Sequence, residues 1–141
     1  MKHTFLALAA IATLGLTTSC KKDKQDEKPK TKVELLTQGS WNVVKYHEVT
    51  YFNDTLYEDE TYPGEGEKLK FNTDYTATFT DSDGETDVSS WILNDNTLLM
   101  ADGEFTIQTL TESQLNLYMK EEGTEPGMGS YKFEYTIFMT R

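Results

Sequence analysis

Few residues in this chain of 141 could perform acid–base or nucleophilic chemistry. It contains two histidines, His3 and His47, and one cysteine, Cys20. His3 lies in the N-terminal segment that is predicted below to be a signal peptide, so a Ser-His-Asp site would have to use His47. His47 lies in a predicted strand, and no nucleophile-elbow motif is present. The 24 acidic residues make some carboxylate pair inevitable, so their number singles out no glycosidase-type pair. The sequence therefore predicts a protein that is not an enzyme.

Two acidic segments raise the question of a metal site. Residues 81–87 (DSDGETD) have oxygen ligands at alternate positions, but an EF-hand loop needs glycine at its sixth position and Gly84 is the fourth residue here. We interpret this segment as a hairpin turn and the acidic residues within 58–67 as a solvated face. A single cysteine excludes an intramolecular disulfide and a multi-thiolate metal cage. Neither a metal nor a cofactor is predicted.

The N-terminal segment has the pattern of a targeting sequence. Lys2 and His3 precede an apolar run over residues 5–16, which as a helix would span about 18 Å. This length is too short for a hydrocarbon core of about 30 Å. Residues 1–19 are therefore predicted to be a secretory signal peptide.

The end of this segment resembles the lipobox of bacterial lipoproteins, whose cysteine is lipidated and becomes the mature N-terminus. Ser19 fits the small residue before Cys20, although Leu16 lies four residues before it, one more than is usual. The resemblance implies that Cys20 carries acyl chains that anchor the protein to the outer membrane of a bacterial envelope, on the periplasmic or the cell-surface side. Several acyl chains anchor firmly where one alone is marginal. An ordinary signal peptide with an unmodified Cys20 is the alternative.

Residues 20–32 are predicted to be a flexible tether after the lipidated cysteine. Positions 21–32 contain no aromatic or aliphatic side chain and carry a net charge of +3, whereas residues 33–141 carry −15. The lysines and acids after Cys20 loosely resemble a surface-export signal of Bacteroidetes lipoproteins, and a plain spacer is an equal alternative. The net charge of −11 argues against nucleic acid as a partner. The lipid membrane is the partner that the sequence predicts, and it names no protein partner.

Residues 33–141 read as one all-β domain. A short helix at 33–37 ends before Gly39, and apolar residues then alternate with polar ones, as is typical of strands with one buried face. The predicted strands are 41–52, 56–61, 67–72, 75–80, 87–93, 97–101, 104–110, 114–120 and 131–140. Short turns between them favour an antiparallel up-and-down barrel of eight or nine strands over a two-sheet sandwich, which needs longer crossovers. Residues 121–130, rich in glycine, are expected to form a flexible loop or a flap at the mouth of the barrel.

Gly39, Ser40 and Trp41, which open the first strand, resemble the lipocalin signature. In that family the tryptophan closes one end of an eight-stranded barrel, and a basic residue of the last strand packs over it. Arg141 is the only arginine and ends the last predicted strand. Residues 69–76 and 91–98 also look like landmarks of the lipocalin-like lipoprotein domains of Bacteroidetes. The resemblance covers about residues 33–141 and implies that Gly39, Trp41 and Arg141 have structural roles in closing the barrel.

The interior of the barrel is the remaining candidate site. An eight-stranded barrel has room for side chains alone or for one small ligand. We expect a lipid-anchored, lipocalin-like protein that binds a small apolar or amphipathic molecule without covalent chemistry. The alternative is a barrel with a filled core that serves as an interaction module, accessory to an envelope or nutrient-uptake complex. The alternation predicts that the candidate ligand-binding residues are Tyr75, Phe79, Phe105, Leu117, Phe133 and Tyr135.

Overall fold

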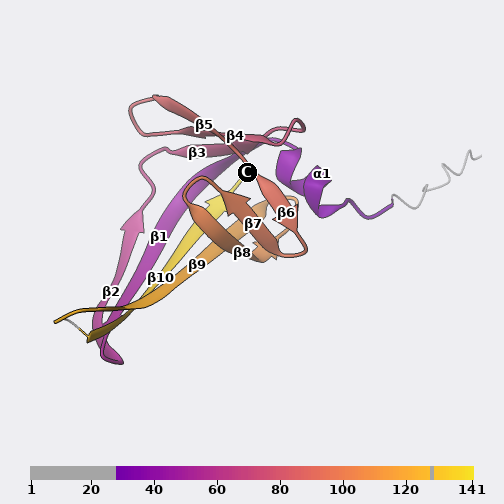
Figure 1. Cartoon of the computed structure of the whole chain (residues 1–141). Helices are drawn as coiled ribbons and strands as arrows, with labels where there is room; N and C mark the ends of the chain where they lie inside the picture. Colours follow the sequence, from indigo (N-terminus) through magenta and orange to yellow (C-terminus); the bar gives the residue numbers. More distant parts are fainter. Residues whose placement is uncertain (1–27, 128) are drawn as a thin grey trace, which may run out of the picture.

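The computed structural model describes residues 28–127 and 129–141. The predicted signal peptide, Cys20 and most of the tether lie outside the described residues. One helix, α1 (Lys32–Thr37), precedes ten strands (Figure 1). These are β1 (Ser40–Phe52), β2 (Thr55–Pro63), β3 (Lys68–Phe71), β4 (Thr76–Thr80), β5 (Thr86–Ser90), β6 (Ile92–Asn94), β7 (Thr97–Met100), β8 (Gly103–Leu110), β9 (Gln114–Glu125) and β10 (Gly129–Thr140). Within the described part of the chain, no helix is long and apolar enough to cross a membrane.

The strands form one antiparallel sheet that curls into a nearly closed barrel. Their order is β5-β4-β3-β1-β10-β9-β8-β7-β6, and β2 pairs with β1 beside this path. Each strand therefore lies beside a neighbour in sequence, and the first strand pairs with the last. The predicted all-β, up-and-down barrel with a short N-terminal helix is confirmed.

The barrel is left unpaired at one seam, between β5 and β6. The sequence predicts a single strand over 87–93, but Trp91 divides it: β5 pairs with β4, whereas β6 pairs with β7. The indole of Trp91 is 1% exposed, donates from Nε1 to the carbonyl oxygen of Thr76 at 3.0 Å, and packs edge-on against Phe71. Because this large ring is buried, the chain turns inward at Trp91. The pairing of β5 with β4 ends before this residue, and the pairing of β6 with β7 begins after it.

A glycine allows the chain to pass from β2 to β3 along the same edge of β1. β1 pairs with β3 through residues 40–42 and with β2 through residues 45–52. Between them, the Gly64 amide donates to the carbonyl oxygen of Val44 at 2.8 Å. A Cβ atom on Gly64 would lie 2.3 Å from the carbonyl oxygen of Val43, so no other residue fits here without a backbone shift.

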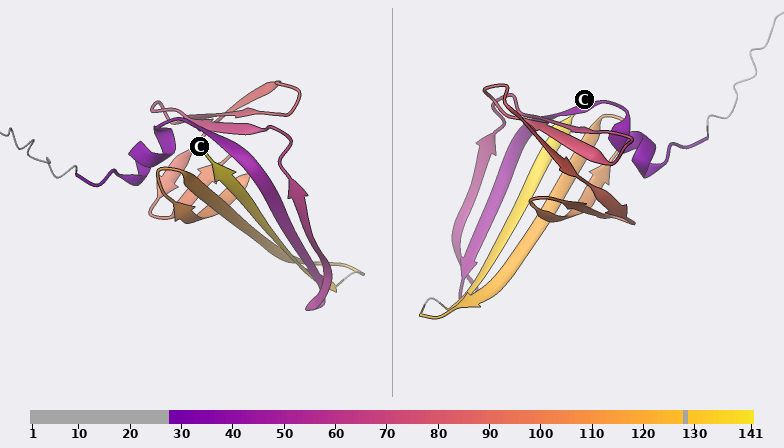
Figure 2. Two further views of the ribbon diagram at one scale, coloured as in Figure 1. Left: turned by 180° about the vertical axis from the view of Figure 1, so that it is seen from behind. Right: turned by 45° about the horizontal axis from the view of Figure 1, so that its top comes forward.

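Four long strands project beyond the barrel as an arm, which we define as residues 47–61 and 120–134. β2, β1, β10 and β9 lie side by side in it (Figures 1 and 2). The expected flexible loop or flap over 121–130 is wrong, because β9 continues to Glu125 and β10 starts at Gly129. Side-chain packing explains the extension: the Tyr131 ring lies over Gly123, where a Cβ atom would be 2.7 Å from its hydroxyl oxygen. The Asn53 side chain accepts a hydrogen bond from the Ser130 amide at 3.0 Å.

Helix α1 covers one end of the barrel, which we call the floor. Thr31 and Glu34 form a capping box, and its hydrogen bonds lower the pKa of Glu34. Leu36 is fully buried in the core. The Lys32 ammonium donates to the carbonyl oxygen of Asp95 at 2.8 Å, which ties the helix to the β6–β7 turn. These contacts leave the opposite end of the barrel, toward the arm, as its open end.

Candidate functional site

Trp41 and Arg141 close the floor of the barrel. Trp41 is fully buried and donates from its indole nitrogen to the carbonyl oxygen of Leu36 at 3.1 Å. The Arg141 guanidinium carbon lies 3.7 Å from the centre of the Trp41 ring. The same guanidinium donates to the carbonyl oxygens of Leu35 and, at 2.8 Å, Glu112. Burial lowers the pKa of Arg141 from its usual value. This arrangement joins the helix, the first strand and the end of the chain.

Gly39 lies beside this pair without a steric need for glycine. Its backbone is not in the left-handed region, and a Cβ atom there would first meet the Arg141 side chain at 3.7 Å, an ordinary contact distance. These contacts give no steric reason for glycine at position 39, and its role in closing the barrel stays a prediction.

A cavity of about 290 Å³ lies above the floor, inside the open end of the barrel. This volume is close to the lower end of the usual range of ligand pockets. It is about ten times the volume per molecule of liquid water, so it has room for about ten heavy atoms. Both halves of the sheet supply its lining, which is mostly apolar: Val43, Tyr46, Leu69, Ala77, Phe79, Ser89, Met100, Asp102, Phe105, Met119, Tyr135, Ile137 and Met139.

Three of the six residues predicted to bind a ligand line this cavity. Phe79 on β4, Phe105 on β8 and Tyr135 on β10 belong to its wall. Leu117 is fully buried, but it packs in the core and does not line the cavity. Phe133 points to the same side of β10 as Tyr135, stacked on it at 6.1 Å, but it belongs to the arm.

Tyr75 does not point into the barrel, and the expectation that it does is wrong. Its side chain is 56% exposed and packs outside against Trp91, with ring centres 5.1 Å apart. The reason is the backbone, since Tyr75 has a φ of +65° in the turn before β4. The left-handed conformation interrupts the alternation that places Ala77 and Phe79 on the inner face.

The sequence prediction missed the methionines and one tyrosine of the lining. Met100, Met119 and Met139 all reach the cavity, and unbranched thioether chains adapt readily to ligands of different shape. Met119 and Met139 alternate with polar residues in the predicted strands, so the sequence pattern places both side chains on the inner face. Alternation alone does not predict that Tyr46 lines the cavity, because a bulge between Val43 and Lys45 shifts the inward-facing positions of β1 by one residue.

Tyr46 and Tyr135 form the polar part of the wall. Their rings stack with centres 5.7 Å apart and planes 13° apart. Burial raises the pKa of Tyr46 to about 12, and the charge of Glu67 and its hydrogen bond to the phenol add to the shift. Burial also raises the pKa of Tyr135, with further contributions from Tyr46 and the carboxylate of Glu48. Both phenols therefore stay protonated: the Tyr46 hydroxyl donates to Glu67, and the Tyr135 hydroxyl is suited to donate a hydrogen bond to a ligand.

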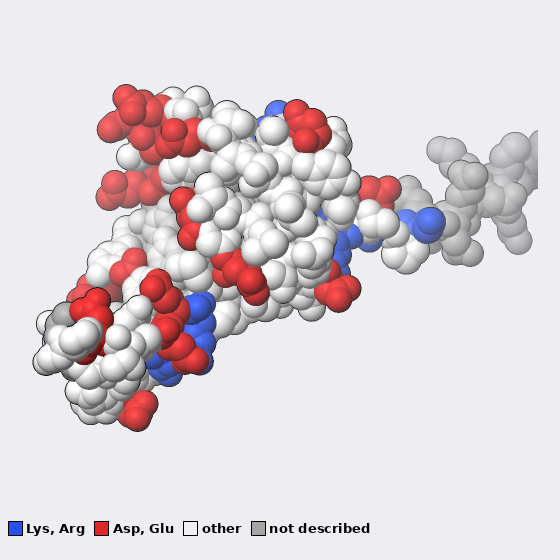
Figure 3. All heavy atoms as spheres, viewed as in Figure 1, with Lys and Arg blue, Asp and Glu red and all other residues white. Residues whose placement is uncertain are grey.

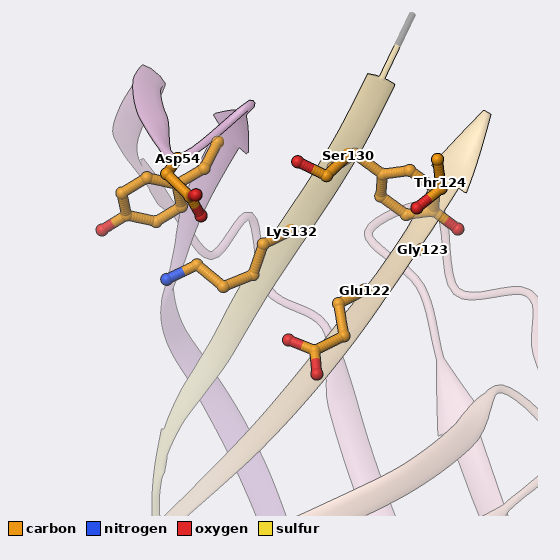
Figure 4. A pocket seen from close by; sticks show the side chains of 8 residues that line it. Asp54, Glu122, Gly123, Thr124, Ser130 and Lys132 are labelled. Atoms are coloured by element: carbon orange, nitrogen blue, oxygen red, sulfur yellow. The ribbon is translucent and has the colours of Figure 1, made fainter. Parts of the chain in front are cut away.

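A second hollow, of about 300 Å³, lies on the outer face of the arm (Figure 4). Asp54, Glu122, Ser130 and Lys132 surround it, and the Lys132 ammonium already lies 3.7 Å from the centre of the Tyr51 ring. Its side chains come from the surface of three strands and the β1–β2 turn. The cavity in the barrel is instead lined on several sides by buried apolar groups. We therefore take the cavity as the candidate site.

The titratable groups described elsewhere in the structure make surface and turn contacts. His47 lies on the outer face of the arm, with its Nε2 2.8 Å from an Asp59 carboxylate oxygen. The Asp81 carboxylate accepts hydrogen bonds from the amides of Asp83 and Glu85, as in a turn. Among the described residues, no group of three or more His, Cys, Asp or Glu side chains is placed to hold a metal ion. Acidic side chains are spread over the arm and the β4–β5 hairpin, and basic ones are sparse (Figure 3).

Comparisons with protein-family models, with curated proteins and with solved structures give no match for this chain. The functional argument therefore rests on the barrel and its cavity.

Proposed function

We propose that this protein binds a small apolar or amphipathic molecule in the cavity of its barrel, and that it does so as a lipocalin-like, lipid-anchored protein of the bacterial outer membrane. The observation that carries the proposal is the cavity itself: about 290 Å³ of space between a closed floor and an open end. Its wall combines apolar side chains with the hydroxyls of Tyr46 and Tyr135. Such a wall suits a ligand with an apolar body and one polar end.

The position of the cavity supports binding without chemistry. The floor is occupied by Trp41 and Arg141, so a ligand enters from the side of the arm. The described residues of the wall offer hydroxyl, carboxyl and thioether groups, and none of them is a histidine, cysteine or lysine. Binding would therefore depend on burial of apolar surface, at about 25 cal/mol per Å², with the two phenols fixing the orientation.

Isothermal titration calorimetry with 1-octanol tests the binding proposal. The full chain with Cys20→Ala is used, so that no attached acyl chain competes for the cavity. We expect saturable binding at one site per chain. Ala77→Phe places a ring in the cavity and should weaken binding at least about tenfold, a loss of about 1.4 kcal/mol. The matched control, Val88→Phe, adds a ring at a residue that is 67% exposed and should leave binding unchanged.

The same titration separates binding from the filled-barrel alternative. If 1-octanol does not bind, or if Ala77→Phe and Val88→Phe behave alike, the cavity is not a ligand site. The protein would then be better described as an interaction module.

The proposed anchor rests on the sequence before Cys20. Cys20→Ala should abolish labelling by a fatty acid analogue and move the protein from the membrane fraction to the soluble envelope fraction. Met139→Leu, a buried change far from the N-terminus in sequence, is the control and should stay labelled. If the Cys20 variant remains labelled and membrane-bound, the lipoprotein proposal is wrong.

A further inference from the structure

The lysines of the strands all lie on the outer face of the sheet. Lys68 and Lys70 flank Leu69, which lines the cavity, and side chains alternate along a strand. Lys120 follows the lining residue Met119. Lys45 pairs with Phe138 on β10. Lys132 lies three positions before the lining residue Tyr135 on the same strand, so the two side chains point to opposite faces of the sheet. No lysine of the described strands therefore faces the cavity or its entrance.

Carboxylates occupy the inner face and the entrance instead. Asp102 is part of the cavity wall. Glu48 pairs with Tyr135, so the two side chains share the inner face. Glu121 pairs with Phe133 in the next layer of the arm. Glu67 lies against the phenol of Tyr46. The polar end of a ligand in the cavity would thus meet negative charge and phenol rings, and none of the lysines of the described strands lies on that face.

We propose that the cavity selects amphipathic molecules whose polar end is positively charged, such as alkylammonium compounds, over neutral ones, and that it rejects fatty acid anions. This inference rests on the proposed function and adds the class of the ligand. The carboxylates of Asp102, Glu48 and Glu67 attract the cation, and the stacked rings of Tyr46 and Tyr135 add a cation–π contribution. A carboxylate ligand would instead be repelled by the same groups.

The surroundings of the phenols agree with a negative potential at this point. The charge of Glu67 raises the pKa of Tyr46, and the charges of Glu48 and Glu67 raise that of Tyr135, beyond the effect of burial. A potential that disfavours a phenolate also disfavours a carboxylate and favours an ammonium group.

The test compares three ligands with the same eight-carbon chain: octylammonium, 1-octanol and octanoate. Each is titrated calorimetrically at pH 7 into the full chain with Cys20→Ala. An exposed ion pair contributes up to about fivefold in affinity, and several carboxylates act in the same direction here. We therefore expect octylammonium to bind at least about tenfold more tightly than octanoate, with 1-octanol between them. Added salt should narrow the difference.

Charge variants assign the preference to the cavity. Asp102→Asn combined with Glu67→Gln should weaken octylammonium binding and strengthen octanoate binding, so that the difference between the two affinities becomes smaller. The control Asp83→Asn removes a charge from the β4–β5 turn and should change none of the three affinities.

The outcomes separate the two proposals. If 1-octanol binds and octylammonium binds no more tightly, the charge preference is refuted while binding in the cavity stands. Octanoate as the tightest ligand would refute it as well. If none of the three binds, the proposed function itself fails.

Discussion

Enlarging Ala77 to leucine tests whether the space inside the barrel is a real cavity. Ala77 is 2% exposed, lies on β4 between Phe71 and Ser89 in the sheet, and lines the cavity. Leucine adds three carbon atoms to a volume of about 290 Å³. Each buried methylene contributes about 0.8 kcal/mol, or about 2 kcal/mol in total, and ordering the longer side chain costs about 0.5–1 kcal/mol. We expect Ala77→Leu to raise the free energy of unfolding by about 1 kcal/mol.

Urea unfolding, followed by the fluorescence of Trp41 and Trp91, measures this change. Both indoles are buried, so their emission reports on the packed state. The midpoint should rise with no change in the m-value, because the surface exposed on unfolding is nearly the same. In a thermal scan the gain corresponds to about 4 °C for a domain of this size.

Leu117→Phe is the matched control, since Leu117 is fully buried in the core and does not line the cavity. Overpacking of a filled core costs about 1–3 kcal/mol. If Ala77→Leu destabilises the protein as much as Leu117→Phe does, the barrel is already full and the reasoning about its interior is refuted.

Three further predictions concern the floor, the phenols and the backbone. Arg141→Ala should lower the free energy of unfolding by about 2 kcal/mol. In a double-mutant cycle its effect should be non-additive with that of Trp41→Phe, because the two residues share one contact. Additive effects would contradict this contact. The pKa of Tyr46 is raised from 10.0 to about 12, so its contribution to stability is complete below pH 10 and is lost as the pH rises through 12. Tyr46→Phe should therefore make alkaline unfolding less steep, and an unchanged profile would contradict the assignment. Gly64→Ala should destabilise by about 1–3 kcal/mol in urea through its clash with the β1 backbone, whereas Gly39→Ala, which meets only ordinary contacts, should stay within about 0.5 kcal/mol; equal costs would contradict this distinction.

The sequence predicted the barrel because its strands alternate with a period of two between short turns. This signal is local and strong in β8, β9 and β10, where Phe105, Leu117 and Tyr135 were placed on the inner face. Pairing of the first and last strands follows from the up-and-down order. Long-range information is needed to tell which inward side chains fill the core, like Leu117, and which line a cavity, like Phe105.

Other features depended on backbone details that alternation does not encode. Tyr75 follows the phase of β4 in sequence but has a positive φ, and a bulge in β1 changes the phase before Tyr46. Trp91 reads as part of one strand but ends a ladder by turning inward. The glycine-rich segment 121–130 suggested a loop, yet Tyr131 packs across Gly123 and extends the hairpin.

The methionine methyl groups give the most direct test that the cavity binds a ligand. Met100, Met119 and Met139 line it from three different strands. In the full chain with Cys20→Ala and ¹³C-labelled methionine methyl groups, titration with 1-octanol should shift all three resonances along one saturable curve. The same titration of the Ala77→Phe variant should give much smaller shifts at matched concentrations. If the three methyl resonances stay unchanged in the parent chain, or move equally in the variant, the cavity does not bind amphipathic molecules and the proposed function is contradicted.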